Sequence, residues 1–161
     1  MSYDELHAAV DVIRERTGRS SHAVAIVLGS GLSEYAASLP DAVEIPYTDI
    51  PGFPVPHVAG HGGTLVSTEL DGTNVLVLAG RVHTYEGWPL DKVVYAVRTA
   101  VLGGASTIVL TNAAGGCGDG LEAGDLVLIR DHLNLTGRNP LVGPIPGLPG
   151  AFAGLAYHGN G

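Results

Sequence analysis

The chain has 161 residues, of which 45% are hydrophobic and 15% are charged, and its formal net charge is -8. This composition predicts one globular domain with a core of its own and excludes a disordered chain. The negative charge argues against a nucleic-acid surface and against a polybasic membrane patch, because both need clustered Lys and Arg.

Cysteine use and the N-terminal residues indicate the compartment. The single cysteine, Cys117, has no second cysteine in the chain to pair with, which fits a reducing environment. The N-terminus has no basic stretch followed by an apolar one, and no apolar run approaches the length needed to span a bilayer. The sequence therefore predicts a cytoplasmic protein without a membrane partner.

The first predicted element is a packing helix over residues 4–17. Leu6, Ala9, Val10 and Ile13 recur at helical spacing and form one apolar stripe. Gly18 stands where a helix stop is expected.

The next segment has the pattern of a strand, a turn and a helix start. Residues 23–28 are continuously apolar, Gly29-Ser30-Gly31 breaks the run, and residues 32–35 can begin a helix. Such a turn presents backbone N–H groups and the Ser30 hydroxyl to an anion, although a plain tight turn explains the same residues. The pattern is not a full dinucleotide or Walker fingerprint, so neither of those cofactors is expected.

Residues 40–63 are rich in Pro and Gly and predict a long irregular loop that covers a ligand. His57 or His61 in this loop is placed to reach a bound anion. We expect no metal here, because the two histidines lack a helical frame and no Cys or carboxylate pattern completes a site.

A strand pair is predicted around residues 64–66 and 75–78, and the second strand passes through Gly80 into a polar run. If the chain stays extended, a period of two places Arg81, His83 and Tyr85 on one side, with Val82 and Thr84 on the other. A guanidinium, an imidazole and a phenol suit an anion with a hydroxylated ligand beside it. The alternative is a polar loop with a solvated Arg.

The remaining pattern alternates helices with apolar strands. Residues 90–102 predict a helix that begins after Pro89 and ends at Gly103-Gly104, with its apolar positions at Val93, Val94, Ala96, Val97, Ala100 and Val101. Residues 107–110 and 125–130 predict two further strands. The fold class is thus an α/β sheet with its ligand crevice at the carboxyl ends of the strands, where Ser30, Arg81 and Asn112 converge.

Five motifs in this order resemble the purine nucleoside phosphorylases of the trimeric type. They are Gly29-Ser30-Gly31-Leu32, Gly60-His61, the run from Gly80 to Gly87, the run from Thr111 to Gly116, and Asp131-His132 through Asn139-Pro140-Leu141. The resemblance implies a nucleoside-phosphorylase-like mixed sheet flanked by helices. It also implies attack of inorganic phosphate on C1′ of a purine nucleoside, which yields pentose 1-phosphate and free base.

The resemblance also implies roles for individual residues. It gives Ser30, His61, Arg81, His83 and the backbone N–H of Ala113 to phosphate, and it gives Tyr85 to the ribose. His83, the implied catalytic residue, is expected to donate to phosphate rather than to act as a general base, because the nucleophile is already anionic. Phosphate is a co-substrate, no other cofactor is implied, and the assembly is a homotrimer.

The C-terminal part departs from the family. No charged residue follows Arg138, and residues 145–161 form a tail rich in Gly, Pro and Ala. We expect residues 1–144 to be the N-terminal part of one phosphorylase domain, incomplete at its C-terminus because the half that binds the base has no counterpart here. Two alternatives remain, namely a non-catalytic phosphate-binding or assembly fragment and a methylthioadenosine phosphorylase.

Overall fold

The computed structural model describes residues 1–29, 31–56 and 63–142, so the predicted tail at residues 145–161 lies outside the described part. The elements are α1 (Tyr3–Thr17), β1 (Val24–Leu28), α2 (Ser33–Ala37), β2 (Val43–Pro46), η1 (Tyr47–Asp49), β3 (Thr64–Leu70), β4 (Thr73–Ala79), η2 (Thr84–Glu86), α3 (Leu90–Val93), α4 (Tyr95–Leu102) and β5 (Thr107–Leu110). Within these residues, no helix is long and apolar enough to cross a membrane.

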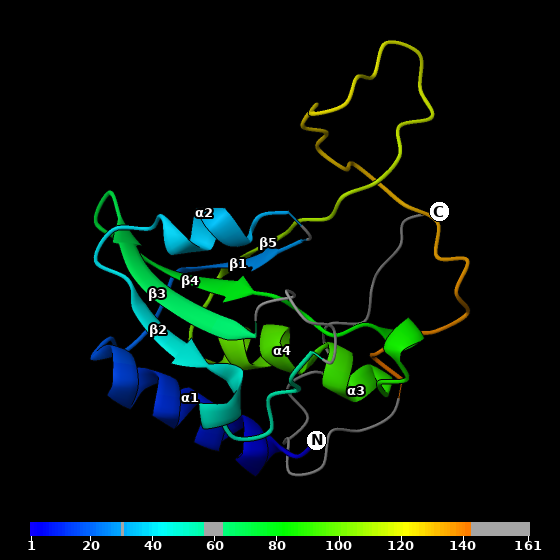
Figure 1. Ribbon diagram of the computed structural model, residues 1–161. Coiled ribbons are helices and arrows are strands. Elements are labelled where there is room, and N and C mark those ends of the chain that lie inside the picture. Colours follow the sequence, from blue (N-terminus) through cyan, green and yellow to red (C-terminus); the bar gives the residue numbers. More distant parts are fainter. Residues whose placement is uncertain (30, 57–62, 143–161) are drawn as a thin grey trace.

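The strands form one five-stranded sheet in the order β2-β3-β4-β1-β5. β1 pairs in parallel with β4 and with β5, whereas β3 pairs in antiparallel fashion with β2 and β4. Helices α1 and α4 lie on one face and α2 lies on the other (Figure 1). This mixed sheet flanked by helices confirms the predicted α/β fold class.

Helix α1 matches the prediction because its ends and its apolar stripe are both encoded locally. Ser2 accepts a hydrogen bond from the Glu5 backbone N–H and the Glu5 carboxylate accepts one from the Ser2 N–H, which together form a capping box. Gly18 ends the helix in the left-handed conformation, with φ of 67°. The predicted stripe is buried against the sheet and is made of Leu6, Ala9, Val10 and Ile13.

The strand pair β3–β4 is a hairpin closed by two residues, Asp71 and Gly72. Both residues have positive φ, 48° and 75°, which matches the twist of the flanking strands and is the setting that Asp-Gly favours. The hairpin confirms the predicted strand pair and makes both strands longer than expected.

The interpretation of residues 40–63 as an irregular loop was incomplete. Strand β2 lies within this segment at the sheet edge, where Ile45 is fully buried and Glu44 is exposed. The alternation of apolar and polar residues at 43–46 was the available signal, and the surrounding prolines obscured it. His57 and His61 lie outside the described residues.

The single helix predicted over residues 90–102 is wrong in its continuity and in its buried face. Val94, with φ of -94° and ψ of 1°, separates α3 from α4, next to a second β-branched residue, Val93. The fully buried positions are Tyr95 and Thr99 together with the expected Ala100, whereas Val101 is 39% exposed. Both hydroxyls have hydrogen-bond partners, the Glu5 carbonyl for Tyr95 and the Tyr95 carbonyl within the helix for Thr99, so this face can be buried although an apolar count does not detect it.

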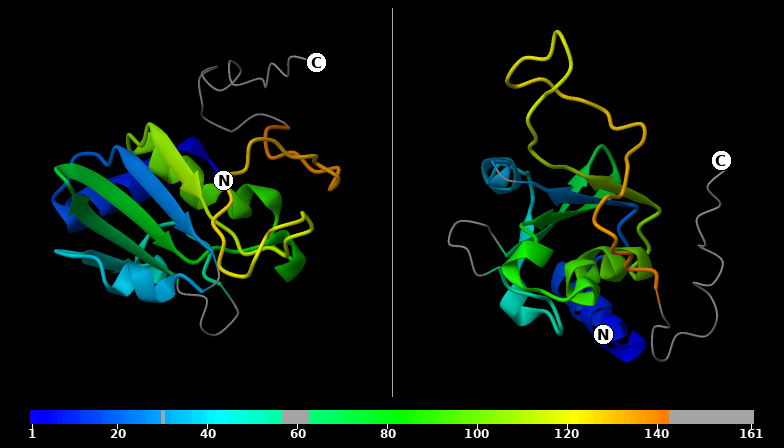
Figure 2. Two further views of the ribbon diagram at one scale, coloured as in Figure 1. Left: turned by 90° about the horizontal axis from the view of Figure 1, so that it is seen from above. Right: turned by 90° about the vertical axis from the view of Figure 1, so that its right-hand side faces the viewer.

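The strand predicted at residues 125–130 is absent from the structure. This segment belongs to an exposed stretch that leaves the sheet after β5, drawn in yellow and orange in Figures 1 and 2. Leu126 is 101% exposed and Leu128 is 95% exposed. A strand needs a neighbour to accept and donate its backbone hydrogen bonds, and the described part of the chain offers this segment none.

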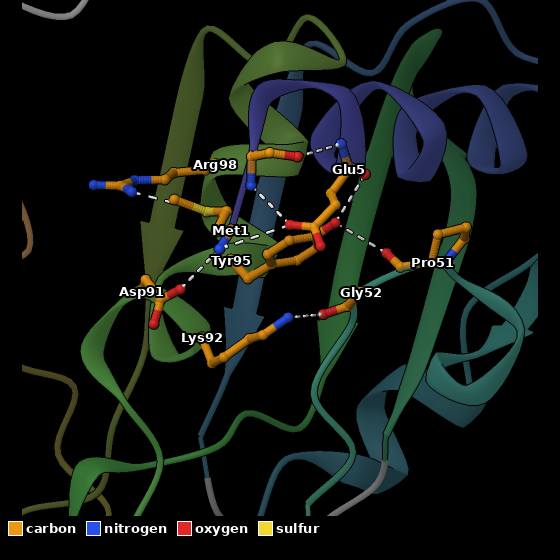
Figure 3. A network of polar contacts seen from close by, with 9 residues as sticks. Met1, Glu5, Pro51, Gly52, Asp91, Lys92, Tyr95 and Arg98 are labelled. Atoms are coloured by element: carbon orange, nitrogen blue, oxygen red, sulfur yellow. Dashed lines mark hydrogen bonds and ion pairs between the residues drawn. The ribbon is translucent and has the colours of Figure 1, made fainter. Parts of the chain in front are cut away.

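A polar network around Tyr95 joins α1 to the segment that follows η1 (Figure 3). The Tyr95 hydroxyl lies 2.8 Å from the Glu5 carbonyl oxygen and 3.0 Å from that of Pro51, and the two carbonyls share its single proton. The Lys92 ammonium donates to the Gly52 carbonyl at 3.2 Å. Burial raises the pKa of the Tyr95 phenol to about 12, so this phenol remains a donor. The network fixes the start of the proline-rich segment on the helical face.

A second polar cluster buries His22 beside an arginine. His22 Nε2 lies 2.7 Å from Ser67 Oγ, and Arg19 Nη1 donates to the same oxygen at 2.9 Å. We therefore assign the Ser67 hydroxyl as donor to a neutral His22. Burial first, and then the Arg19 charge, lowers the pKa of His22 to about 4.

We expect this histidine to make the fold sensitive to acid. The unfolded chain binds its proton near pH 6.5 and the folded chain only near pH 4. Protonation of His22 therefore leaves the free energy of unfolding unchanged above pH 6.5 and lowers it progressively as the pH falls toward 4. Urea unfolding of the wild type and of His22→Gln at pH 7 and pH 5 measures it, because the variant removes the titrating group. Equal pH dependence of the two proteins would contradict this assignment.

Candidate active site

The carboxyl ends of the parallel strands β1, β4 and β5 lie at one edge of the sheet. The register pairs Leu28 with Ala79 and pairs Val27 with Leu110, so the three strands end side by side. The chain leaves these ends at Gly29, Gly80 and Thr111. The predicted convergence of three strand ends is therefore present in the backbone, although Ser30 itself lies outside the described residues.

Thr111 ties the ends of β1 and β5 together. Its backbone N–H and its hydroxyl both donate to the Val27 carbonyl, each at 3.0 Å, and the hydroxyl accepts from the Gly29 N–H at 2.8 Å. The approach is so close that a Cβ added to Gly29 would lie 2.9 Å from the Thr111 carbonyl oxygen and 3.0 Å from Asn112 Cα. Only glycine fits at position 29 without moving one of the two strand ends.

Arg81 connects β4 to the same point. Its Nη1 donates to the Thr111 carbonyl at 2.6 Å, and the residue is half-buried. A guanidinium carries five N–H donors in a planar fork, so this contact orients the group and uses only one of them. Arg81 is thus a half-buried cation, oriented by this contact at the convergence of three strand ends.

The turn before Arg81 is held from the side by Tyr47. Gly80 has φ of 107°, which favours glycine, and its carbonyl accepts a hydrogen bond from the Tyr47 hydroxyl at 2.8 Å. Tyr47 is 2% exposed, and burial raises the pKa of its phenol, so the hydroxyl remains protonated and donates. A buried phenol therefore fixes the backbone from which Arg81 projects.

The segment after Arg81 follows the predicted alternation only in part. Val82 is 2% exposed and faces the core, while Arg81 and His83 are half-buried. The chain then turns into η2 at Thr84, so Thr84 does not continue the extended pattern. The rings of His83 and Tyr85 stack in parallel, with centroids 4.8 Å apart and an interplanar angle of 13°. Tyr85 is 77% exposed.

Glu86 supports His83 through the backbone. Glu86 Oε1 accepts from the His83 N–H at 2.9 Å, and the Glu86 N–H donates to the His83 carbonyl at 3.1 Å. Glu86 Oε2 is buried, and it has no hydrogen-bond partner within the described ranges. These contacts fix the backbone of the turn from which the imidazole projects.

The structure describes only some of the predicted site residues. Arg81, His83 and Tyr85 follow β4, and Ala113 is exposed two residues beyond Thr111. Ser30 and His61 lie outside the described residues. Thr111 and Tyr47 were not predicted as part of the site. The polar residue directly after an apolar strand was the available signal for Thr111, whereas no local pattern marks Tyr47 because its contact spans 33 positions.

Chemically, the arrangement suits an anion. Arg81 supplies a positive charge at the ends of parallel strands, where backbone N–H groups and loops gather, in a chain whose overall net charge is -8. In the described part of the chain, no group of three or more His, Cys, Asp or Glu residues is placed to hold a metal ion.

Comparison with protein families identifies relatives. Residues 23–159 match the model of the phosphorylase superfamily. A purine nucleoside phosphorylase of Mycobacterium leprae is 54% identical over 142 residues, which cover 87% of this chain and 53% of that protein. Purine nucleoside phosphorylase 1 of Geobacillus stearothermophilus is 43% identical over 144 residues, which cover 89% of this chain and 52% of that protein.

Solved structures of purine nucleoside phosphorylases also superpose on this chain. Purine nucleoside phosphorylase of Schistosoma mansoni in complex with inosine superposes with a TM-score of 0.78 at 36% identity, over 89% of this chain and 50% of that one. Isoform 2 of that enzyme, in complex with cytosine and ribose-1-phosphate, gives a TM-score of 0.79 at 36% identity, over 89% and 51%. The chain thus spans about half the length of the relatives it matches.

Proposed function

The chain belongs to the phosphorylase superfamily, and from this membership we propose that it supplies the phosphate-binding half of a purine nucleoside phosphorylase. The single observation that carries the proposal is the Arg81 guanidinium, which the Thr111 carbonyl holds at 2.6 Å where β1, β4 and β5 end. The relatives of known structure include complexes with inosine and with ribose-1-phosphate, which are a purine nucleoside and a pentose 1-phosphate.

In the proposed reaction, a phosphate oxygen forms a bond to C1′ of the nucleoside as the bond from C1′ to the purine nitrogen breaks. The bonding electrons leave with the base, which takes up a proton, and pentose 1-phosphate remains. Positive charge develops on the sugar in the transition state, so the protein's task is to hold the anionic nucleophile in line with the breaking bond. Phosphate is the co-substrate, and no further cofactor takes part.

We assign five residues to phosphate and one to the sugar. Ser30, His61, Arg81, His83 and the Ala113 N–H bind phosphate, and Tyr85 contacts the ribose. The stacked arrangement of His83 and Tyr85 supports neighbouring roles, because it places a ring that donates beside a ring with an apolar face and a polar tip. The active protein is a cytoplasmic homotrimer with residues 1–144 as the first part of its domain.

A chimaera tests this assignment. Residues 1–138 are joined to the part of the Mycobacterium leprae relative that follows its equivalent of Arg138, and the release of hypoxanthine from inosine is followed with and without phosphate. We expect release only when phosphate is present. Hydrolysis at the same rate without phosphate would contradict the assignment.

A second candidate, a non-catalytic phosphate-binding fragment, is favoured by the chain's coverage of only about half of each relative. Binding phosphate alone does not align it with C1′ or stabilise the leaving purine, and both tasks supply much of the rate. We therefore expect the 161-residue chain alone to show no phosphorolysis in the same assay. Turnover of inosine by this chain, abolished by Arg81→Ala, would exclude the fragment interpretation.

A further inference from the structure

Two glycines with positive φ adjoin residues that are proposed to bind phosphate. Gly80 directly precedes Arg81 and has φ of 107°, and Gly63 comes two positions after His61 and has φ of 99°. Glycine has more backbone freedom than any other residue, so such a position keeps one conformation only when neighbouring groups constrain it. The contacts of these two glycines therefore decide how firmly the adjoining residues are held.

Tyr47 contacts both glycines from the end of the edge strand β2. Its backbone N–H donates to the Gly63 carbonyl at 2.7 Å, and its side-chain hydroxyl donates to the Gly80 carbonyl at 2.8 Å. The Gly63 N–H donates in turn to the carbonyl of Ala79, the residue before Gly80, at 2.8 Å. One residue thus joins the start of β3 to the end of β4 at the edge of the sheet where the candidate site lies.

Tyr47 is itself anchored in the core. It is 2% exposed, and its ring meets Phe53 edge to face with the centroids 5.0 Å apart. Phe53 meets Tyr95 in the same way at 5.6 Å. Tyr95 is fully buried and its hydroxyl contacts the carbonyls of Glu5 and Pro51 (Figure 3). Because close packing restricts these rings, the Tyr47 hydroxyl is a fixed point against which the turn at Gly80 is set.

We propose that Tyr47 is a positioning residue for phosphate, acting through the Gly80 carbonyl on Arg81. The proposal rests on the proposed function, because it takes Arg81 as a phosphate ligand. The guanidinium is held at its tip by the Thr111 carbonyl, 2.6 Å from Nη1, and at its backbone by the turn that Tyr47 fixes. A site whose supporting contacts are loosened binds less well although every ligand is still present. A phenol that only satisfied its own hydrogen bond in the core would affect stability alone.

The test compares two substitutions that each remove one buried hydroxyl from the same aromatic cluster. Tyr47→Phe keeps the ring and loses the contact with Gly80, whereas Tyr95→Phe loses the contacts with Glu5 and Pro51. Inorganic phosphate is titrated into the 161-residue chain and into each variant, and the backbone amide signals in NMR spectra give Kd. We expect Tyr47→Phe to raise Kd roughly three- to tenfold, as loss of one hydrogen bond does, and Tyr95→Phe to leave it within about twofold. Urea unfolding measures the stability of both variants, which we expect to fall by similar amounts.

A double variant tests whether Tyr47 acts through Arg81. With Arg81→Ala in place, Tyr47→Phe should raise Kd by less than about twofold, because the effects of residues that act as a unit are not additive. Equal increases for Tyr47→Phe and Tyr95→Phe, or the same increase with and without Arg81, would overturn the proposal.

The phosphate titration is independent of turnover. A chimaera that binds phosphate but releases no base from inosine would contradict the proposed function, and the Kd values would still decide the role of Tyr47. If the unsubstituted chain bound no phosphate, the assignment of Arg81 and the role of Tyr47 would both be wrong.

Discussion

Arg81→Ala in the chimaera is expected to lower kcat/KM for phosphorolysis roughly ten- to hundredfold and to raise the phosphate concentration that the enzyme requires. The substitution removes a charge-assisted contact to the anion, worth about 1.5–3 kcal/mol. It also removes the bond from Nη1 to the Thr111 carbonyl, which links β4 to β5. Initial rates measured over a range of phosphate concentrations at saturating inosine give both effects.

Arg81→Lys is the matched control for charge. Lysine keeps the positive charge but loses the planar fork, so its three donors are not held in the geometry that contacts the Thr111 carbonyl and matches phosphate at the same time. We expect activity between that of the wild type and that of Arg81→Ala. If Arg81→Ala left the phosphate requirement unchanged, Arg81 would have no part in binding phosphate.

The elements that the sequence predicted well are those whose signals are local. In α1, the stripe, the cap and the stop glycine all lie within residues 2–18 and agree with one another. The hairpin at Asp71 and Gly72 is equally local, because the turn residues alone set its geometry. For such elements, tertiary structure adds length but does not change their type.

The failures have a common physical origin in contacts between distant segments. The break at Val94 accompanies a buried Tyr95 whose hydroxyl reaches Glu5, 90 positions away. Residues 125–130 have the apolar pattern of a strand, but pattern alone supplies no neighbour for their backbone groups. A sequence pattern thus reports which face an element can bury, and the partner decides whether it does.

The candidate site likewise combines residues with local sequence signals and residues that act only through distant contacts. The polar residues after β4 were recognisable because they follow an apolar strand, and parallel strand ends meet at one edge. The residues that position them are less visible. Thr111 acts through one hydroxyl that bonds Val27 and Gly29, more than 80 positions away, and Tyr47 acts through the Gly80 carbonyl. Such contacts are specified by the fold and not by spacing along the chain.

Gly29→Ala is expected to disturb the site without touching any residue assigned to bind substrate. The new Cβ would lie 2.9 Å from the Thr111 carbonyl oxygen, a backbone atom that has no rotamer to move into. The ends of β1 and β5 must separate, which weakens the bond from the Gly29 N–H to the Thr111 hydroxyl. Overpacking of this kind costs about 1–3 kcal/mol of unfolding free energy, which urea unfolding of the 161-residue chain measures. Gly115→Ala is the control, because a Cβ at Gly115 meets nothing within 4 Å.

The same substitution should act on activity through Arg81, because the carbonyl oxygen that a Cβ at position 29 would displace is the one that Arg81 Nη1 contacts. In the chimaera, Gly29→Ala should therefore reduce kcat/KM. Combined with Arg81→Ala, it should cost less than the sum of the two single losses, because residues that share a partner are not additive. Fully additive losses would show that Gly29 and Arg81 act independently and that the Thr111 carbonyl does not connect them.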